Sequence, residues 1–346
     1  MDAAAARARL DELWGRGRAF LGCEHALMGG AMTWVSERRL VAAMSNAGAF
    51  GVVACGAMNP AQLGAEIDAT FAGTNKPFGV NLIIMHPELD RLIEVCLERR
   101  VGHIVFAGGM PSSKAIKRVR DGGARVVCFA PSLGIAKRLV RLGAEAIVIE
   151  GSEAGGHIGP VSTSVLAQEI LPNLTDVPVF VAGGIGRGDA IIAFLEMGAA
   201  GCQLGTRFVC ATESIAHPKF KRAFINAAAR DAMPSVQLDP LFPVIPVRAL
   251  QNKGTQRFAD TQREVIARFR SGALTQDAAQ LEIEHFWAGA LRRAVIEGDT
   301  EYGSLMAGQS VGMVTKEQST TEIIAELINQ AIEALRGRCR NGHRDE

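Results

Sequence analysis

Eight short apolar runs, each ending in glycine or a small polar residue, recur along about the first 210 residues. Each run is continuous rather than alternating, as in parallel strands that are buried on both faces. Helix-period segments separate the runs. This alternation predicts an α/β fold, a (β/α)8 TIM barrel, whereas a doubly wound open sheet would need fewer strands. The runs are HALMGG, FGVVACG, PFGVNLII, HIVFAGG, RVVCFAP, AEAIVIEG, VPVFVAGG and AAGCQLGT.

The strand–helix rhythm breaks after Arg207. The following stretch has helical patterns, such as KFKRAFINAAAR and TQREVIARFR, but no second series of strands. We therefore expect residues 1–215 and 300–346 to form the barrel, with 216–299 as a smaller inserted α-helical subdomain. Barrel enzymes keep their active sites at the C-terminal face of the strands, and we expect the insertion to cover that face.

The charge balance and the lengths of the apolar runs argue against nucleic acid and membranes as partners. The 37 Lys and Arg residues against 36 Asp and Glu residues give a formal net charge of +1, without a basic stripe for nucleic acid. No stretch approaches the roughly 18 apolar residues of a membrane span. The N-terminal residues 1–22 have alternating charge and no continuous apolar core, so they indicate a short helix and not a signal peptide. We expect a cytoplasmic protein.

The cysteines and histidines give no metal signature. The seven cysteines include no CxxC pair, and several lie in apolar runs, which favours small buried side chains in a reducing compartment. A cysteine nucleophile is the alternative. The sequence has no HxH, HExxH or Cys/His cluster, so we predict no metal site. It also lacks the GxSxG elbow of a serine hydrolase.

One glycine-rich loop directly follows the sixth apolar run, from Glu150 to Gly159. Gly155 and Gly156 let the backbone pass close to a ligand, because no Cβ stands in the way. His157 lies in this loop at the end of a barrel strand, where an imidazole can act as a general base. The alternative is a structural histidine that orders the loop, and position alone does not separate the two.

Two further glycine turns follow the seventh and eighth runs, at Gly183-Gly184 and at Gly205. Barrels commonly bind a phosphate there through backbone N–H groups and a helix N-terminus, and Thr206 adds a hydroxyl donor. Mere tight turns are the alternative. The GIGRG segment is a weak match to a dinucleotide fingerprint, which we reject because Gln203 and its neighbours replace the acidic residue of that motif. Asn81 suits the edge of a heterocycle, or caps the barrel core.

Taken together, these segments resemble the nitronate monooxygenase (2-nitropropane dioxygenase) family and the related FMN-dependent enoyl-acyl carrier protein reductases. The segments that carry the resemblance are GAMTWV, SNAG, KPFGVN, EAGGH, AGGI, QLGTRF and MAGQ. One departure is Ala26, where these families usually have proline after the residue that matches His25. The resemblance implies one FMN per barrel and His157 as the catalytic residue. The residues it implies for the flavin are Ala31, Met32, Asn81, Glu150, Gly155, Gly156, Gly183, Gly184, Gln203, Gly205, Thr206 and Gln309.

The resemblance also implies a reaction. Our leading hypothesis is oxidation of alkyl nitronates by O2 to carbonyl compounds and nitrite, with His157 taking or steering the proton next to the nitro group. The alternatives are an enoyl-acyl carrier protein reductase that uses NAD(P)H, an NADH:quinone reductase, and a non-catalytic flavin-binding barrel. The expected partners are a small-molecule substrate with NAD(P)H and O2, and no nucleic acid or membrane. A homodimer stays open.

Overall fold

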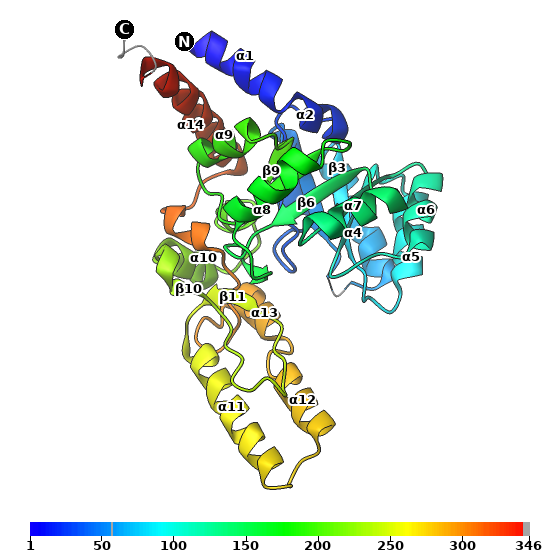
Figure 1. Ribbon diagram of the computed structural model, residues 1–346, viewed down its shortest axis with the longest axis vertical. Helices are drawn as coiled ribbons and strands as arrows, with labels where there is room; N and C mark the ends of the chain where they lie inside the picture. Colours follow the sequence, from blue (N-terminus) through cyan, green and yellow to red (C-terminus); the bar gives the residue numbers. More distant parts are fainter. Residues whose placement is uncertain (57, 342–346) are drawn as a thin grey trace.

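The central element is a sheet of eight parallel strands that closes on itself. The computed structural model describes residues 1–56 and 58–341 (Figure 1). The strand order is β1-β9-β8-β6-β5-β4-β3-β2, and the ends of that order meet through a parallel bridge between Met28 and Phe50. All eight apolar runs form strands, so the predicted TIM barrel is confirmed. The strands are β1 (Leu27–Gly29), β2 (Gly51–Ala54), β3 (Phe78–Ile83), β4 (His103–Ala107), β5 (Arg125–Phe129), β6 (Ala146–Glu150), β8 (Val179–Ala182) and β9 (Gly201–Leu204).

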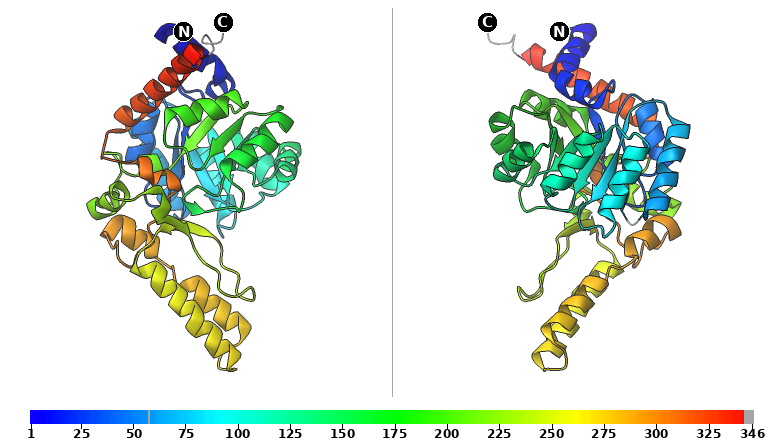
Figure 2. Two further views of the ribbon diagram at one scale, coloured as in Figure 1. Left: turned by 60° about the vertical axis from the view of Figure 1, so that its left-hand side comes forward. Right: turned by 90° about the vertical axis from the view of Figure 1, so that its right-hand side faces the viewer.

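Helices follow the strands and surround the barrel (Figures 1 and 2). Local sequence explains their ends. Asn59 and Gln62 form a capping box at the start of α4 (Pro60–Gly73), and Gly143, with φ of 109°, ends α7 (Leu133–Leu142). These helices are α3 (Arg38–Asn46), α4 (Pro60–Gly73), α5 (Leu89–Glu98), α6 (Ser113–Asp121), α7 (Leu133–Leu142), α8 (Thr163–Ile170) and α9 (Gly188–Glu196).

The barrel interior is filled by apolar side chains. Phe50, Phe106 and Phe180 are fully buried, as are most of the valines and isoleucines on the strands. Burying one such side chain stabilises the fold by about 1.5–3 kcal/mol. The two N-terminal helices, α1 (Ala3–Leu13) and α2 (Gly15–Leu21), and the long C-terminal helix α14 (Thr320–Asn341) lie together, beyond the end of the barrel away from the insertion (Figures 1 and 2). The short helix predicted at the N-terminus is confirmed.

The segment between β9 and α14 is helical, as predicted, with one addition. Its helices are α10 (Pro218–Ile225), α11 (Lys253–Arg270), α12 (Gln276–His285) and α13 (Ala290–Arg292). Two short strands, β10 (Ala232–Pro234) and β11 (Val247–Leu250), also form there, although we expected none. They pair with β7 (Gly156–His157), in the order β10-β11-β7. They escaped the sequence reading because each is only three or four residues long and pairs with distant parts of the chain.

Helices α11 and α12 form an arm that extends away from the barrel (Figures 1 and 2). The arm has its own small apolar cluster, which includes Phe242, Phe258 and Ile283. Elements α10, β10, β11 and α13 of the insertion lie between the barrel and this arm (Figure 1). Domain limits at residues 215 and 299, with the insertion as a cover for the active site, stay a prediction.

Candidate active site at the carboxyl ends of the strands

The predicted phosphate turn after β8 has the backbone that glycine permits. Gly183 and Gly184 have φ of 96° and 71°, in the left-handed region that side chains disfavour. A Cβ on Gly183 would lie 2.9 Å from Oγ1 of Thr163, and one on Gly184 would lie 3.0 Å from Cβ of Glu153. Helix α9 begins four residues after the turn, so its N-terminal N–H groups lie close by in sequence.

The turn after β9 contributes a hydroxyl. Thr206 begins a short 3₁₀ helix, η2 (Thr206–Phe208), and its Oγ1 accepts a hydrogen bond of 2.9 Å from the N–H of Gly308. The hydroxyl hydrogen is therefore left to donate to another group, as a phosphate site needs. Met32 lies beside this turn, because its Sδ is 3.4 Å from the position of a Cβ on Gly205.

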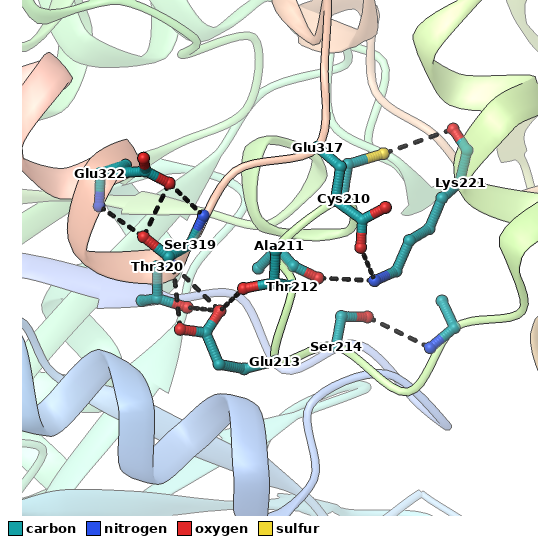
Figure 3. Close-up of polar contacts among 11 residues, drawn as sticks. Cys210, Ala211, Thr212, Glu213, Ser214, Lys221, Glu317, Ser319, Thr320 and Glu322 are labelled. Carbon is teal, nitrogen blue, oxygen red and sulfur yellow. Dashed lines mark hydrogen bonds and ion pairs between the residues drawn. The ribbon is translucent and has the colours of Figure 1, made fainter.

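The chain beyond this turn is held by polar contacts to distant segments (Figure 3). The buried Lys221 donates from Nζ to the carbonyl oxygen of Ala211 and to Oε1 of Glu317, both at 2.7 Å. The carboxylate of Glu213 accepts bonds from the N–H and the hydroxyl of Thr320 at the start of α14, each at 2.9 Å. These bonds fix the segment that follows η2 and so support the turn at Thr206.

Glu153 connects the loop after β6 to the phosphate turn, and sequence reasoning missed it. Its Oε2 accepts two 2.9 Å bonds, from the N–H and the hydroxyl of Thr163 at the start of α8. Its backbone oxygen accepts a 2.9 Å bond from the N–H of Gln309. Glu153, Thr163, Gly183, Gly184 and Gln309 share the lining of a pocket of about 330 Å³. The sequence signal that could have identified Glu153 is that it is the second carboxylate, after Glu150, in this glycine-rich loop.

His157 lies on β7 and pairs antiparallel with Val247 of the insertion. The residue is exposed at the surface, and desolvation of the imidazole by the atoms packed around it lowers its pKa from the ordinary value of 6.5. A neutral imidazole of this kind can accept a proton near neutral pH. Gly156, with φ of 80°, shapes the chain just before it, and a Cβ on Gly155 would collide with the backbone of Ala307 and Gly308.

The remaining predicted residues lie at the barrel mouth. Glu150 ends β6, and desolvation raises the pKa of its carboxyl to about 8, so at neutral pH it is mainly a protonated donor. Asn81 is buried in β3 and donates from Nδ2 to the carbonyl oxygen of Val105 at 3.2 Å. Gln203 is buried in β9, next to Ala182 of β8 in register. In the described part of the chain, no hydrogen bond joins His157 to Glu150 or Asn81.

The predicted loops therefore meet at the mouth of the barrel. Gly183, Gly184 and Gln309 line one pocket with Glu153, and Thr206 joins it through Gly308. Ala31 and Met32 lie in the turn after β1, where the buried hydroxyl of Ser36 bonds to the oxygen of Gly30 and the N–H of Met32.

The cysteine alternative loses support. The six described cysteines are free, and five of them are buried. Burial raises the pKa of the Cys128 and Cys210 thiols to about 12 and that of Cys55 to about 11, so little thiolate exists at neutral pH. The side chain of Cys339 lies outside the described residues.

Residues 1–56 and 58–341 include no group of three or more His, Cys, Asp or Glu side chains arranged to hold a metal ion. Within the same residues, no helix is both long and apolar enough to cross a membrane.

Comparison with known proteins places the chain in a family. The nitronate monooxygenase family profile matches residues 17–91 and 88–330. A 5-hydroxy-7a-methyl-1-oxo-octahydro-1H-indene-4-carboxyl-CoA dehydrogenase of Mycobacterium tuberculosis is 31% identical, over 91% of this chain and 95% of that protein. The nitronate monooxygenase of Paraburkholderia phytofirmans is 28% identical, with the same two coverages.

A solved structure agrees in fold across the chain. The FabK protein of Thermotoga maritima is 34% identical, with a TM-score of 0.83, and the alignment covers 93% of this chain and 98% of that one. The family profile, the relatives and the barrel with its glycine turns lead to one assignment. The chain is a flavin-dependent oxidoreductase and belongs to the nitronate monooxygenase family.

Proposed function

We propose that the flavin is FMN, held at the two glycine turns. The residues fit such a group: Gly183 and Gly184 line a pocket of about 330 Å³, and the Thr206 hydroxyl retains a hydrogen to donate to a phosphate. Next to the phosphate turn, where Glu150 of β6 pairs with Ala182 of β8, the protonated carboxyl of Glu150 can donate to a flavin heteroatom. We see no second site for an adenosine half in the sequence, which favours FMN over FAD.

We propose that His157 handles the proton of the reaction. The observation that carries this proposal is its place on β7, in the glycine loop after β6, with a lowered pKa that keeps the imidazole neutral. A neutral imidazole removes a proton from a carbon that neighbours a strongly electron-withdrawing group. FMN, when bound, would supply the electron transfer. The protein supplies the base and a fixed orientation.

The first substrate class that we propose is an alkyl nitronate or nitroalkane, oxidised with O2 to a carbonyl compound and nitrite. The family match and the similarity to the Paraburkholderia nitronate monooxygenase support it. A second class, an acyl thioester, is favoured by a specific observation: the relative from Mycobacterium tuberculosis, at 31% identity, is a carboxyl-CoA dehydrogenase. A neutral nitroalkane presents an acidic C–H bond to His157, whose imidazole would take that proton. Reduction of an enoyl thioester would instead need a proton delivered to the α-carbon, which the protonated form of His157 would give.

The partners follow from these reactions. We propose a small-molecule substrate, with O2 for nitronate oxidation or NAD(P)H for thioester reduction, in a cytoplasmic protein whose free, mostly buried thiols suit a reducing compartment. Whether the protein forms a homodimer stays open.

One anaerobic titration separates the two classes. Purified protein is mixed with a nitronate, with NADH or with NADPH, and the visible absorbance of the flavin is followed. Bleaching by the nitronate, followed by nitrite formation when O2 is admitted, is the expected result. Bleaching by NADH or NADPH, with recovery on adding an enoyl thioester, replaces the first class by the second. Heat release of FAD in place of FMN would refute the cofactor assignment.

A further inference from the structure

Arg248 is a buried arginine from the insertion that binds the loop of His157. It lies on β11 with only 7% of its surface exposed. Its Nε donates to the carbonyl oxygen of Ser152 at 2.8 Å, and its Nη1 donates to the carbonyl oxygen of Ala232 at 2.6 Å. The guanidinium of Arg248 therefore joins the loop after β6 to strand β10. Ser152, its partner in that loop, lies 96 residues before it in the chain.

The position of Arg248 in the sheet ties it directly to His157. Arg248 lies opposite Gly156, and the neighbouring pair joins Val247 to His157. The carbonyl oxygen of Arg248 also accepts a 3.3 Å bond from the N–H of Ala307. Backbone pairing holds the loop at its Gly156–His157 end, while the guanidinium holds it at Ser152. The two contacts bracket the three residues between Ser152 and Gly156.

Burying the charged guanidinium of Arg248 costs free energy. Burial lowers the pKa of its guanidinium, with the nearby Glu153 acting in the opposite direction. Among the described residues, no carboxylate forms an ion pair with it, so carbonyl oxygens alone satisfy the two donors. A buried cation without a paired anion costs free energy that an apolar side chain would avoid. Packing alone therefore does not account for an arginine here.

We propose that Arg248 is a positioning residue for the reaction: by fixing residues 152–157 it sets the place and orientation of the His157 imidazole. The proposal rests on the role of His157 proposed above. The insertion would thus supply part of the catalytic geometry. Lysine can keep only one of the two carbonyl contacts, since its single ammonium lacks the planar fork that reaches two separated carbonyls.

The experiment combines Arg248→Met and Arg248→Lys with His157→Asn. Misplacement of a base by about 1 Å costs up to roughly 100-fold in rate, so we expect kcat of Arg248→Met to fall roughly 10- to 100-fold, with KM and flavin content nearly unchanged. Arg248→Lys should recover part of the loss. The double variant Arg248→Met/His157→Asn should be no slower than His157→Asn alone, because Arg248 acts only through His157. Arg230→Met is the matched control, since that arginine is 91% exposed, and it should behave as wild type.

Hydrogen exchange of the loop amides gives a second readout. Residues 151–158 should exchange faster in both Arg248 variants, with flavin still bound, and at the wild-type rate in Arg230→Met. Full kcat in Arg248→Met, or fully additive losses in the double variant, overturns the proposal while leaving the role of His157 intact. If His157→Asn itself retains full activity, the proposed proton transfer fails. The exchange rates then decide whether Arg248 holds the loop, and unchanged rates reject that as well.

Discussion

The hydroxyl oxygen of Thr206 accepts a 2.9 Å hydrogen bond from the backbone N–H of Gly308, 102 residues further along the chain. This bond joins the turn after β9 to the segment that leads into Gln309. Within residues 1–56 and 58–341, the Thr206 hydroxyl donates no hydrogen bond to the protein. Two loops that border the proposed phosphate site are thereby fixed relative to each other. The hydroxyl of Thr206 therefore has two roles, as the acceptor for the N–H of Gly308 and as the proposed donor to a phosphate.

Replacing Thr206 should weaken flavin binding in proportion to the lost hydrogen bonds. Thr206→Val keeps the shape of the side chain but removes both the acceptor for Gly308 and the donor for a phosphate. A hydrogen bond to a charged group contributes about 1.5–3 kcal/mol, so we expect Kd for FMN to rise roughly 10- to 100-fold. Thr206→Ser keeps the hydroxyl and should stay within a few-fold of wild type. Fluorescence titration of FMN into flavin-free protein measures both, and equal affinities for Val and Ser would contradict the assignment.

Gly184→Val should abolish FMN retention and leave the barrel folded. The branched side chain would enter the space in front of the turn, where its Cβ already lies 3.0 Å from Cβ of Glu153. The φ of 71° adds backbone strain of about 1–3 kcal/mol. Gly198→Val is a matched control, because Gly198 has φ of 104° with nothing within 4 Å of its Cβ position. The control should lose similar stability in thermal melts and keep its flavin. A Gly184→Val protein that purifies yellow moves the phosphate site elsewhere.

The pH dependence of turnover should report His157. As a base, His157 acts when neutral, and its lowered pKa keeps it neutral to pH values below 6.5. The kcat/KM for a neutral nitroalkane should therefore fall on the acid side of that value. His157→Asn should remove this limb and slow the reaction by roughly 10²–10⁴-fold, with flavin bound. A pre-formed nitronate has already lost its carbon proton and should be affected less. Equal slowing of both substrates indicates positioning, and loss of flavin indicates a structural histidine.

Glu150 should make the folded protein less stable as the pH rises. Its pKa is raised to about 8 in the fold, above the ordinary value of 4.5, so the folded state holds a proton that the unfolded chain has released between these values. The stability that the protonated carboxyl contributes is complete below about pH 4.5 and is lost as the pH rises toward 8. Glu150→Gln should therefore gain stability relative to wild type at high pH, by a few kcal/mol at most, since one pKa unit is about 1.4 kcal/mol. Thermal melts of both proteins across this range measure the difference, and parallel curves would contradict it.

The strands and glycine turns could be read from the sequence because their signals are local. The run AEAIVIEG is continuous and apolar, and it forms β6, while the glycines at 183 and 184 mark a turn that needs positive φ. Cap residues act within a few positions of each other, as Asn59 and Gln62 do. Thr206 was predicted from its place after a glycine turn and Gln309 from the resemblance alone, and the fold brings both to the mouth of the barrel through contacts with Gly308 and Glu153.

The rest was decided by the tertiary structure, because it depends on pairs of residues far apart in the chain. β11 is four residues long and has no local reason to be a strand, and it forms where β7 and β10 offer unpaired backbone groups. The contacts of Glu153 with Thr163 and Gln309, and of Arg248 with Ser152 and Ala232, exist only once the barrel has closed. The same closure removes water from Glu150 and raises its pKa. The sequence by itself determined which segments would become strands and turns, since hydrophobic period and backbone freedom are properties of single residues and their neighbours. Only the tertiary structure decided which loops meet and how each titratable group is solvated, since distance and desolvation are properties of the folded chain.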